Sequence, residues 1–466
     1  MGEYAPVTAS SQPDWQAPLL EGAVPVPLAA ARRDPAAWPG YDPRPSVRVL
    51  CLASGLVAAV WDFSAYGGSF GEDDASALVA AVDLARARQV PLLTLVRSGG
   101  TRLQEGMAAL VGIPRARLAL LALSAAGLPH LSVADAPTTG GVWVSVVQAA
   151  DLRVAVEGAT VGFSGPRVVE AVTGTAPPPG SHTATSACAG GLVDAALPGA
   201  EVPRWVAAAL RALTPEPRPV PAPEPAVPDA SGGGWKQVAR SRRRTTGGAD
   251  LLGALLTDGV PLRAARSDDT VAAVVGRAAG RPAVGVALAA RVGVRPTPDG
   301  FRLAARAYRL ADRLGLPVLS LVDTPGAEPG AAAEQDGLAA AIGEALDCLL
   351  VCRSPTVALV HGEGGSGGAL AAAAADVVLL TPDSWFAAIA PEGASAALRR
   401  SPQECADLLR LTPADLLALG AADALLARPQ DALWHLAELA GQDGEARRDR
   451  RVRRWSSPLP GTLEPR

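Results

Sequence analysis

Lysine is almost absent from this sequence of 466 residues, in which Lys236 is the single example. A lysine that forms a Schiff base or carries covalent biotin would therefore have to be Lys236. Neither role fits its surroundings, because a biotinyl lysine normally lies between methionines, and the only methionines are Met1 and Met107. Any cofactor that swings between sites must then arrive on another protein.

Cysteine and histidine are also scarce, and the net charge is small. Five scattered cysteines are too few for a disulfide framework in a chain of this size, so we expect them to be reduced, with no zinc site. The four histidines have no serine or cysteine in a nucleophile-elbow context beside them, which leaves a Ser-His-Asp triad unsupported. A formal net charge of −4 and only 4% aromatic residues give no footprint for nucleic acid.

Long hydrophobic runs and a secretory leader are missing as well. No apolar run reaches the length of a membrane span, and the N-terminus lacks a basic segment followed by an apolar core and a cleavage site. We therefore expect a cytoplasmic protein that does not bind a membrane. With 49% apolar and 19% charged residues, the chain is long enough for two domains with substantial cores.

What the sequence does contain is an internal repeat. Four landmarks of the first half return 225 to 227 residues later. They are Pro91 (Pro317), Pro129 (Pro355), Gly140-Gly141 (Gly367-Gly368) and Gly165-Pro166 (Ala390-Pro391). A nearly constant offset indicates one structural unit that is used twice.

Each glycine pair follows an apolar run and precedes a segment rich in alanine or valine, a pattern typical of strand, tight turn and helix. At such a turn, two backbone N–H groups can point at one oxygen with no side chain between them. Donors of this kind stabilise an enolate or another oxyanion by about 3 kcal/mol each in acyl-transfer sites. The alternative is that the glycines only let the helix pack closely on the strand. Repetition in both halves favours an oxyanion site in each.

Strands that alternate with helical segments in both halves indicate α/β architecture. The chain divides into an extended N-terminal arm (1–45), a first domain (46–212), a proline-rich spacer (213–233), a second domain (234–440) and a charged tail (441–466). The tail contains EARRDRRVRRW, a composition more typical of a solvated face or a disordered end than of a binding element.

Seven motifs lie in a fixed order along residues 46 to 430. The first half contains SGGTRLQEG (98–106), DAPTTGGVWVSV (135–146) and EGATVGFSGPRVVE (157–170). The second half contains WKQVARSRRRTT (235–246), GLPVLSLVDTPGAEPG (315–330), GEGGSGGALA (362–371) and IAPEGASAAL (389–398). In this order the motifs resemble the β and α carboxyltransferase subunits of bacterial acetyl-CoA carboxylase, fused in one chain through the proline-rich spacer.

The resemblance implies two tandem crotonase-like domains, each a ββα superhelix. It also implies a carboxyltransferase that moves the carboxyl group from carboxybiotin, held on a separate carrier protein, to acetyl-CoA, giving malonyl-CoA. Two oxyanions form in this reaction, so two backbone sites are needed. By motif position, Gly140 and Gly141 would bind the thioester oxygen, and Gly367 and Gly368 the ureido oxygen of biotin. The implied partners are biotin carboxylase, the biotin carboxyl carrier protein and a second copy of the chain.

The resemblance also suggests which residues contact the substrates. The CoA channel would be lined by Gly67, Gly68 and Ser69 and by Ser98, Gly99, Gly100 and Arg102. The walls around the reacting atoms would come from Phe163, Ser164, Gly165 and Pro166 and from Ala390, Pro391, Glu392 and Gly393.

The chain departs from the family pattern at two places. The four-cysteine zinc ribbon that usually begins the β subunit is missing, since only Cys51 precedes Cys188. The α subunit usually has a lysine-bearing basic element in the region of residues 285–300, and here Arg291 and Arg295 are the nearest replacements.

Two other interpretations stay open from the sequence. One is a crotonase-fold CoA-thioester enzyme of different chemistry, a decarboxylase or a hydratase. A hydratase would need paired carboxylates as acid and base, for which Glu105, Asp135 and Glu363 are the nearest candidates. The other interpretation is a non-catalytic assembly subunit, which the missing basic element favours and the two intact glycine pairs oppose.

Overall fold

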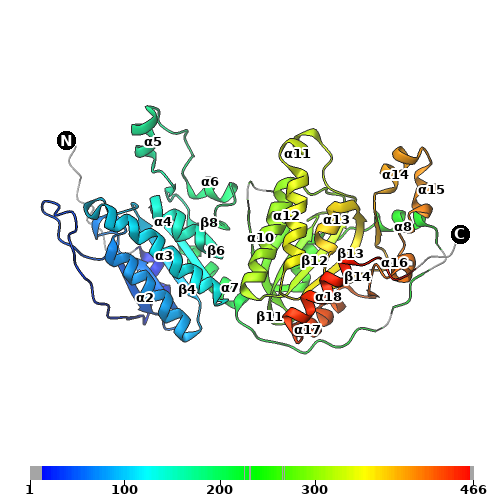
Figure 1. Cartoon of the computed structure of the whole chain (residues 1–466), viewed down its shortest axis with the longest axis horizontal. Coiled ribbons are helices and arrows are strands. Elements are labelled where there is room, and N and C mark those ends of the chain that lie inside the picture. Colours follow the sequence, from blue (N-terminus) through cyan, green and yellow to red (C-terminus); the bar gives the residue numbers. More distant parts are fainter. Residues whose placement is uncertain (1–12, 225, 230–231, 265, 267, 462–466) are drawn as a thin grey trace. The chain divides into compact units, whose positions relative to one another are not determined.

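The computed structural model describes residues 13–224, 226–229, 232–264, 266 and 268–461 (Figure 1). The chain forms two compact units, Met1–Ala207 and Ala208–Arg466. The boundary falls within α7 (Val202–Leu213), and the predicted proline-rich spacer begins where this helix ends. The described residues between α7 and α8 (Gly234–Ser241) contain neither helix nor strand.

The first unit is built on one mixed sheet with the strand order β1-β2-β3-β4-β5-β6-β8, and β7 pairs with β5. Strands β1 to β3 are antiparallel neighbours, and the pairs from β3 to β8 are parallel. The strands are β1 (Val24–Pro25), β2 (Val47–Cys51), β3 (Val57–Trp61), β4 (Leu92–Ser98), β5 (His130–Thr139), β6 (Leu152–Val156), β7 (Val161–Gly162) and β8 (Ala195–Leu197). The longer helices are α2 (Glu72–Arg88), α3 (Met107–Ala125), α4 (Gly140–Ser145), α5 (Pro166–Thr173) and α6 (Ala184–Ala189).

The second unit repeats this plan with the strand order β16-β14-β13-β12-β11-β10-β9, and β15 pairs with β13. Its strands are β9 (Leu256–Pro261), β10 (Val271–Ala278), β11 (Arg281–Leu288), β12 (Val318–Thr324), β13 (Thr356–Gly365), β14 (Val377–Leu380), β15 (Trp385–Ala387) and β16 (Ala424–Leu425). Its helices after α8 are α9 (Gly248–Leu255), α10 (Pro298–Leu314), α11 (Ala331–Gln335), α12 (Leu338–Val351), α13 (Ser366–Ala373), α14 (Pro391–Leu398), α15 (Pro402–Leu408), α16 (Pro413–Leu419), α17 (Ala432–Ala440) and α18 (Gly444–Ser456).

In both units an antiparallel strand pair is followed by parallel strands that are separated by helices. The pair β2–β3 corresponds to β10–β11, and β4, β5 and β6 correspond to β12, β13 and β14. The inner strands β3 and β12 are buried along their whole length, as expected for strands in the middle of such a sheet. The predicted α/β class and the predicted repeat are confirmed.

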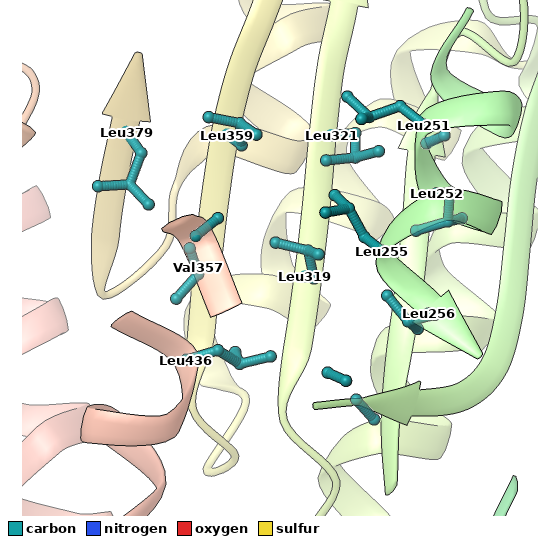
Figure 2. Close-up of a cluster of buried hydrophobic side chains, with 14 of the residues drawn as sticks. Leu251, Leu252, Leu255, Leu256, Leu319, Leu321, Val357, Leu359, Leu379 and Leu436 are labelled. Carbon is teal, nitrogen blue, oxygen red and sulfur yellow. The ribbon is translucent and has the colours of Figure 1, made fainter. Parts of the chain in front are cut away.

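A leucine-rich core holds helix α9 on the sheet of the second unit (Figure 2). Leu251, Leu252 and Leu255 lie on α9 and point at the sheet. Leu319 and Leu321 on β12 meet them, because alternate residues of a strand face the same side. Burial of each such side chain contributes about 2 kcal/mol to folding. This packing fixes the strands whose ends carry the second glycine turn.

Helix α3 is the one helix of the described residues that is long and apolar enough to cross a membrane, although only 28% of its most apolar window is buried. No such segment was expected from the sequence. Core helices of soluble proteins pass the same test, and α3 packs against α2. Its other side exposes Met107, Leu110, Leu118 and Leu121.

The described part of the N-terminal arm is largely irregular, as predicted, yet side chains anchor it to the first unit. Trp15 donates through Nε1 to the Asp135 carboxylate at 3.2 Å. The Tyr41 hydroxyl donates to the Glu105 carboxylate. The short strand β1 adds to the edge of the sheet beside β2. The arm therefore contacts the ends of two segments that belong to the candidate site.

The described part of the charged tail forms a helix, α18, so the alternative of a disordered end is wrong; most of its residues are exposed, whereas Arg447 and Arg451 are buried. Arg451 is fully buried and pairs with Asp376, with Nη2 2.7 Å from Oδ2. Its Nη1 also donates to the carbonyl oxygens of Leu349 and Cys352, at 2.8 and 2.6 Å. The sequence pattern missed this role because the partner aspartate lies far away in the chain and joins α18 only through the fold.

Candidate active site

The first glycine turn lies where β5 ends and α4 begins. Gly140, the first residue of α4, has a φ angle of +67°, in the left-handed region that glycine adopts without steric cost. The turn also approaches the loop after β4 closely, since a Cβ on Gly140 would stand 3.0 Å from the Cα of Gly100. Both facts explain the glycine at position 140.

The loop after β4 faces this turn with its backbone. Gly100 has a φ angle of +108°, and its N–H donates to the Ser98 hydroxyl at 3.1 Å. The next residue, Thr101, has its backbone nitrogen 3.8 Å from the position of a Cβ on Gly140. The N–H of Gly141, like the other first-turn N–H groups of a helix, has no acceptor inside α4. Thr101 and Gly141 thus supply backbone N–H groups to one small region.

The second turn, where β13 ends and α13 begins, has the same backbone form. Ser366, the first residue of α13, has a φ angle of +69°. Gly326, in the loop after β12, has a φ angle of +135°, and its N–H donates to the Thr324 hydroxyl at 3.1 Å. A Cβ on Gly368 would stand 2.9 Å from the backbone nitrogen of Ala327. The second unit therefore contains a counterpart of the first backbone site.

The two sites correspond with an offset of 226 residues at every position. The equivalent residues are Ser98 and Thr324, Gly100 and Gly326, Thr101 and Ala327, and Gly140 and Ser366. The predicted pairing of Gly140-Gly141 with Gly367-Gly368 is therefore wrong by one position. It matched glycine to glycine, whereas the backbone accepts a serine at the left-handed position. Gly141 corresponds to Gly367.

Gly140 does not offer its N–H to a ligand, contrary to the prediction. That N–H donates to the carbonyl oxygen of Phe163 at 2.9 Å, which ties the turn to the segment after β7. Gly141 and Thr101 are left as candidate donors in the first unit. Thr101 and Ala327 were not predicted, although the shared spacing of SGGT and TPGA, each with a glycine before the donor, was a usable signal.

The predicted CoA-channel segments come together beside the first turn. The N–H of Gly99 donates to the carbonyl oxygen of Gly67 at 2.9 Å. Gly68 has a φ angle of +64° and lies so close to the Arg97 carbonyl oxygen that any side chain there would collide with it. Ser69 accepts a hydrogen bond from the Arg102 Nε at 3.2 Å. The two loops are therefore one rigid structure.

Arg102 is a structural residue rather than part of the channel lining that was predicted. It is 1% exposed, with Nη2 2.8 Å from Asp74 Oδ2 and Nη1 3.2 Å from Glu105 Oε1. Its remaining N–H groups reach the carbonyl oxygens of Ser69 and Arg44 at 2.5 and 2.9 Å. With all of its donors occupied, this guanidinium joins the arm, α2 and the loop after β4.

The predicted wall residues begin the helices that follow β7 and β15. Gly165 is the N-cap of α5 and Pro166 its first residue, as Ala390 and Pro391 are for α14. Ser164 immediately precedes the N-cap of α5. Phe163, whose carbonyl oxygen accepts from the first turn, is 69% exposed. Glu392 and Gly393 lie in the first turn of α14, and Glu392 faces Arg242.

The three carboxylates that a hydratase could use are each occupied. Glu105 accepts from the Glu72 N–H at 2.6 Å and pairs with Arg102. Asp135 accepts from Trp15 and from the adjacent backbone N–H. Glu363 pairs with Arg242. Because an acid and a base need free access to the reacting atoms, these contacts do not favour the hydratase interpretation.

Beneath the second turn lies a layer of buried charge. Arg244 pairs with Asp323, with Nη2 2.5 Å from Oδ2, and its Nη1 donates to the carbonyl oxygen of His361 at 2.6 Å. Asp323 in turn accepts from the Glu363 N–H at 3.0 Å. Burial raises the pKa of Glu363, whereas hydrogen bonds from Arg242 lower the pKa of Glu392. Both arginines thus hold carboxylates at the ends of β12 and β13.

His361 supplies a test of this layer through pH. Burial lowers the pKa of His361 from 6.5 to about 4, so the neutral ring favours the folded state above pH 6.5. That contribution is lost as the pH falls from 6.5 towards 4, and its full size is about 3 kcal/mol. We expect His361→Gln to lose less unfolding free energy than wild type between pH 7 and pH 4, as measured by urea denaturation.

A matched control is His182→Asn in the first unit, where the half-buried histidine has a φ angle of +54° that asparagine tolerates. Its pH profile should follow wild type. Parallel profiles for His361→Gln and wild type would contradict the assignment of the acid sensitivity to this ring.

Comparison with known proteins agrees with this geometry. The sequence model of the family described as acetyl co-enzyme A carboxylase carboxyltransferase-like matches residues 236–441. A relative from Salinispora tropica, named acetyl-coenzyme A carboxylase carboxyl transferase subunits beta/alpha, is 39% identical over 412 residues, which cover 82% of this chain and 72% of the relative. The chain belongs to the carboxyltransferase family of biotin-dependent acyl-CoA carboxylases. It is an acyl-CoA carboxyltransferase.

Other carboxyltransferases support the assignment and the fold. A relative from Mycobacterium bovis, named probable biotin-dependent acyl-coenzyme A carboxylase beta3 subunit, is 36% identical over 84% of this chain and 81% of its own length. The solved structure of transcarboxylase 12S, at 22% identity, matches 90% of this chain and 87% of its own with a TM-score of 0.74. The predicted tandem crotonase-like fold is confirmed.

Proposed function

We propose that this carboxyltransferase moves the carboxyl group of carboxybiotin, held on a separate carrier protein, to acetyl-CoA, giving malonyl-CoA. The observation that carries the proposal is the pair of backbone sites, one in each unit, with matching φ angles at Gly140 and Ser366. The transfer develops negative charge on two oxygens, the thioester enolate and the biotin ureido oxygen. One site for each charge accounts for the duplication.

The chain's own residues would act by holding these oxygens. In the first unit the N–H groups of Gly141 and Thr101 would bind the thioester oxygen, and in the second unit those of Gly367 and Ala327 would bind the ureido oxygen. Donors fixed in advance lower the barrier because they need no reorganisation as the charge appears. No side-chain base is required, since the ureido nitrogen takes the proton from the acyl group.

The expected partners follow from what the chain can carry itself. Lys236, the single lysine, is exposed on α8, but it lacks the flanking methionines that are normal for a biotinyl lysine. The biotin would therefore be held by a separate biotin carboxyl carrier protein, which a biotin carboxylase would load. We also propose a homo-oligomer, in which the apolar side chains that α5 exposes, Val168 and Val172, become buried. Transcarboxylase 12S, the similar structure, forms a hexamer. A cytoplasmic location remains part of this proposal.

The reverse reaction tests the function with the full chain alone. We expect malonyl-CoA to yield acetyl-CoA in a reaction that depends on added biocytin, measured by separation of the CoA esters. The rate should fall in Gly141→Val at the start of α4, because a Cβ there would stand 2.8 Å from the Ile113 side chain of α3. Methylmalonyl-CoA, tested in parallel, reports the acyl preference.

Two results would contradict the proposal in different ways. Acetyl-CoA formation that does not need biocytin would indicate a decarboxylase. No turnover of either thioester, even with a biotinylated carrier protein present, would favour a non-catalytic assembly subunit.

A further inference from the structure

Arg242 connects β13, the strand that ends in the second turn, with a predicted wall of the second site on α14. It follows α8, and its Nε donates to Glu363 Oε1 at 2.9 Å. Its two terminal nitrogens donate to both oxygens of Glu392, at 2.6 and 3.1 Å. All three guanidinium nitrogens therefore donate, and the bidentate contact with Glu392 fixes the orientation of the carboxylate as well as its distance from Arg242. No role for Arg242 was predicted from the sequence.

The two carboxylates lie at sensitive positions. Glu363 is buried on β13 and directly precedes Gly364 and Gly365, the last residues before the left-handed Ser366. Glu392 lies in the first turn of α14, the helix whose start was predicted to wall the reacting atoms. A displacement at either carboxylate would move backbone that belongs to the second turn or to its wall.

The first unit fixes its turn differently. With the offset of 226 residues, Pro137 takes the place of Glu363 and Arg97 the place of Asp323. There Arg97 donates through Nε to the Ala136 carbonyl oxygen at 2.6 Å, next to Pro137. The first unit thus has a proline ring and one hydrogen bond from Arg97 at the place where Arg242 joins two carboxylates in the second unit. The Arg242 bridge is a feature of the second site alone.

We propose that Arg242 is a positioning residue for the second backbone site, where it holds the Ser366 turn and the start of α14 at the spacing that biotin requires. This inference rests on the proposed function for the identity of the ligand. Arg242 acts through Glu363 and Glu392 and does not itself supply a donor to the oxyanion. Its effect falls on the biotin half-reaction and leaves the acyl-CoA site unchanged.

The kinetic test uses Arg242→Gln in the full chain with malonyl-CoA and biocytin. We expect kcat/KM for biocytin to fall about tenfold, a size typical of coupled neighbouring groups, while KM for malonyl-CoA stays within about twofold of wild type. Arg242→Lys should recover only part of the loss, because an ammonium cannot contact both carboxylates with a planar fork. Arg309→Gln, which removes a pair with Glu344 between α10 and α12 at 2.6 Å, is the matched control.

A double variant separates positioning from charge neutralisation. Arg242→Gln combined with Glu363→Gln removes the unpaired buried carboxylate and should restore thermal stability. Because the bridge to α14 is still missing, kcat/KM for biocytin should stay low. Recovery of both quantities would overturn the proposal, since Arg242 would then only neutralise Glu363.

Hydrogen exchange decides the inference without any turnover. Amide exchange in residues 389–398 should rise in Arg242→Gln and stay at the wild-type level in Arg309→Gln. Unchanged exchange in Arg242→Gln would overturn the inference, whatever the wild-type activity. Inactive wild type with raised exchange would instead count against the proposed function alone.

Discussion

Gly368→Ala should lower the rate of biocytin-dependent acetyl-CoA formation by about 10²-fold, the loss typical of removing one oxyanion donor. The added methyl group would stand 2.9 Å from the Ala327 nitrogen and 3.2 Å from the Ala327 Cβ. The nearest atom is backbone, so it cannot rotate away as a long side chain could. The Ala327 N–H must therefore shift, and the second site loses the alignment of its two donors.

The control for this variant is Gly343→Ala on α12, where a new Cβ meets no atom within 4 Å. That change should leave kcat unchanged and add up to about 1 kcal/mol of helix stability. Steady-state rates and circular dichroism on both variants check the prediction. Wild-type turnover in a correctly folded Gly368→Ala would show that the Ala327 N–H is not a donor to the oxyanion.

Arg451→Met should destabilise the second unit by about 3 kcal/mol, the lower end of the cost of breaking a buried ion pair, because Arg447 Nε still lies 3.6 Å from Asp376 Oδ2. The Asp376 carboxylate would lose its two hydrogen bonds from Arg451, of 2.8 and 2.7 Å. The carbonyl oxygens of Leu349 and Cys352 would lose their donor as well. For a unit of this size, the melting temperature should fall by roughly 10 °C.

Calorimetry on the full chain measures this fall, and Arg453→Met on the exposed side of α18 is the control. The control should stay within about 0.5 kcal/mol of wild type. Equal melting temperatures for both variants would mean that α18 is not part of the cooperative unit.

The architecture was predictable because it depends on patterns that are local or repeated. Apolar runs such as PLLTLV marked the parallel strands, and the near-constant offset between Pro91 and Pro317 identified the duplication. The positions of the two turns followed from the Gly-Gly pairs. The apolar runs and the glycine pairs are made of the same residues that form the strands and the turns, so a short stretch of sequence is enough to predict each of them.

The register of the turns could not be predicted, because a left-handed residue is defined by backbone angles that sequence letters do not report. Ser366 has the conformation of Gly140, although its side chain suggested otherwise. The roles of the arginines failed for a related reason. Arg102 and Arg451 are charged residues in polar motifs. Only the fold shows that they form buried ion pairs with aspartates that are distant in sequence, Asp74 and Asp376.

Helix α18 also determines when the second unit can be completed during synthesis. Domains tend to fold as units while the chain emerges, yet every strand of this sheet precedes α18 in the order of translation. A nascent chain can thus assemble the sheet while Asp376 and Asp423 still lack Arg451 and Arg454, their later partners. Until α18 emerges, these two aspartates lack the guanidinium groups that pair with them in the finished domain.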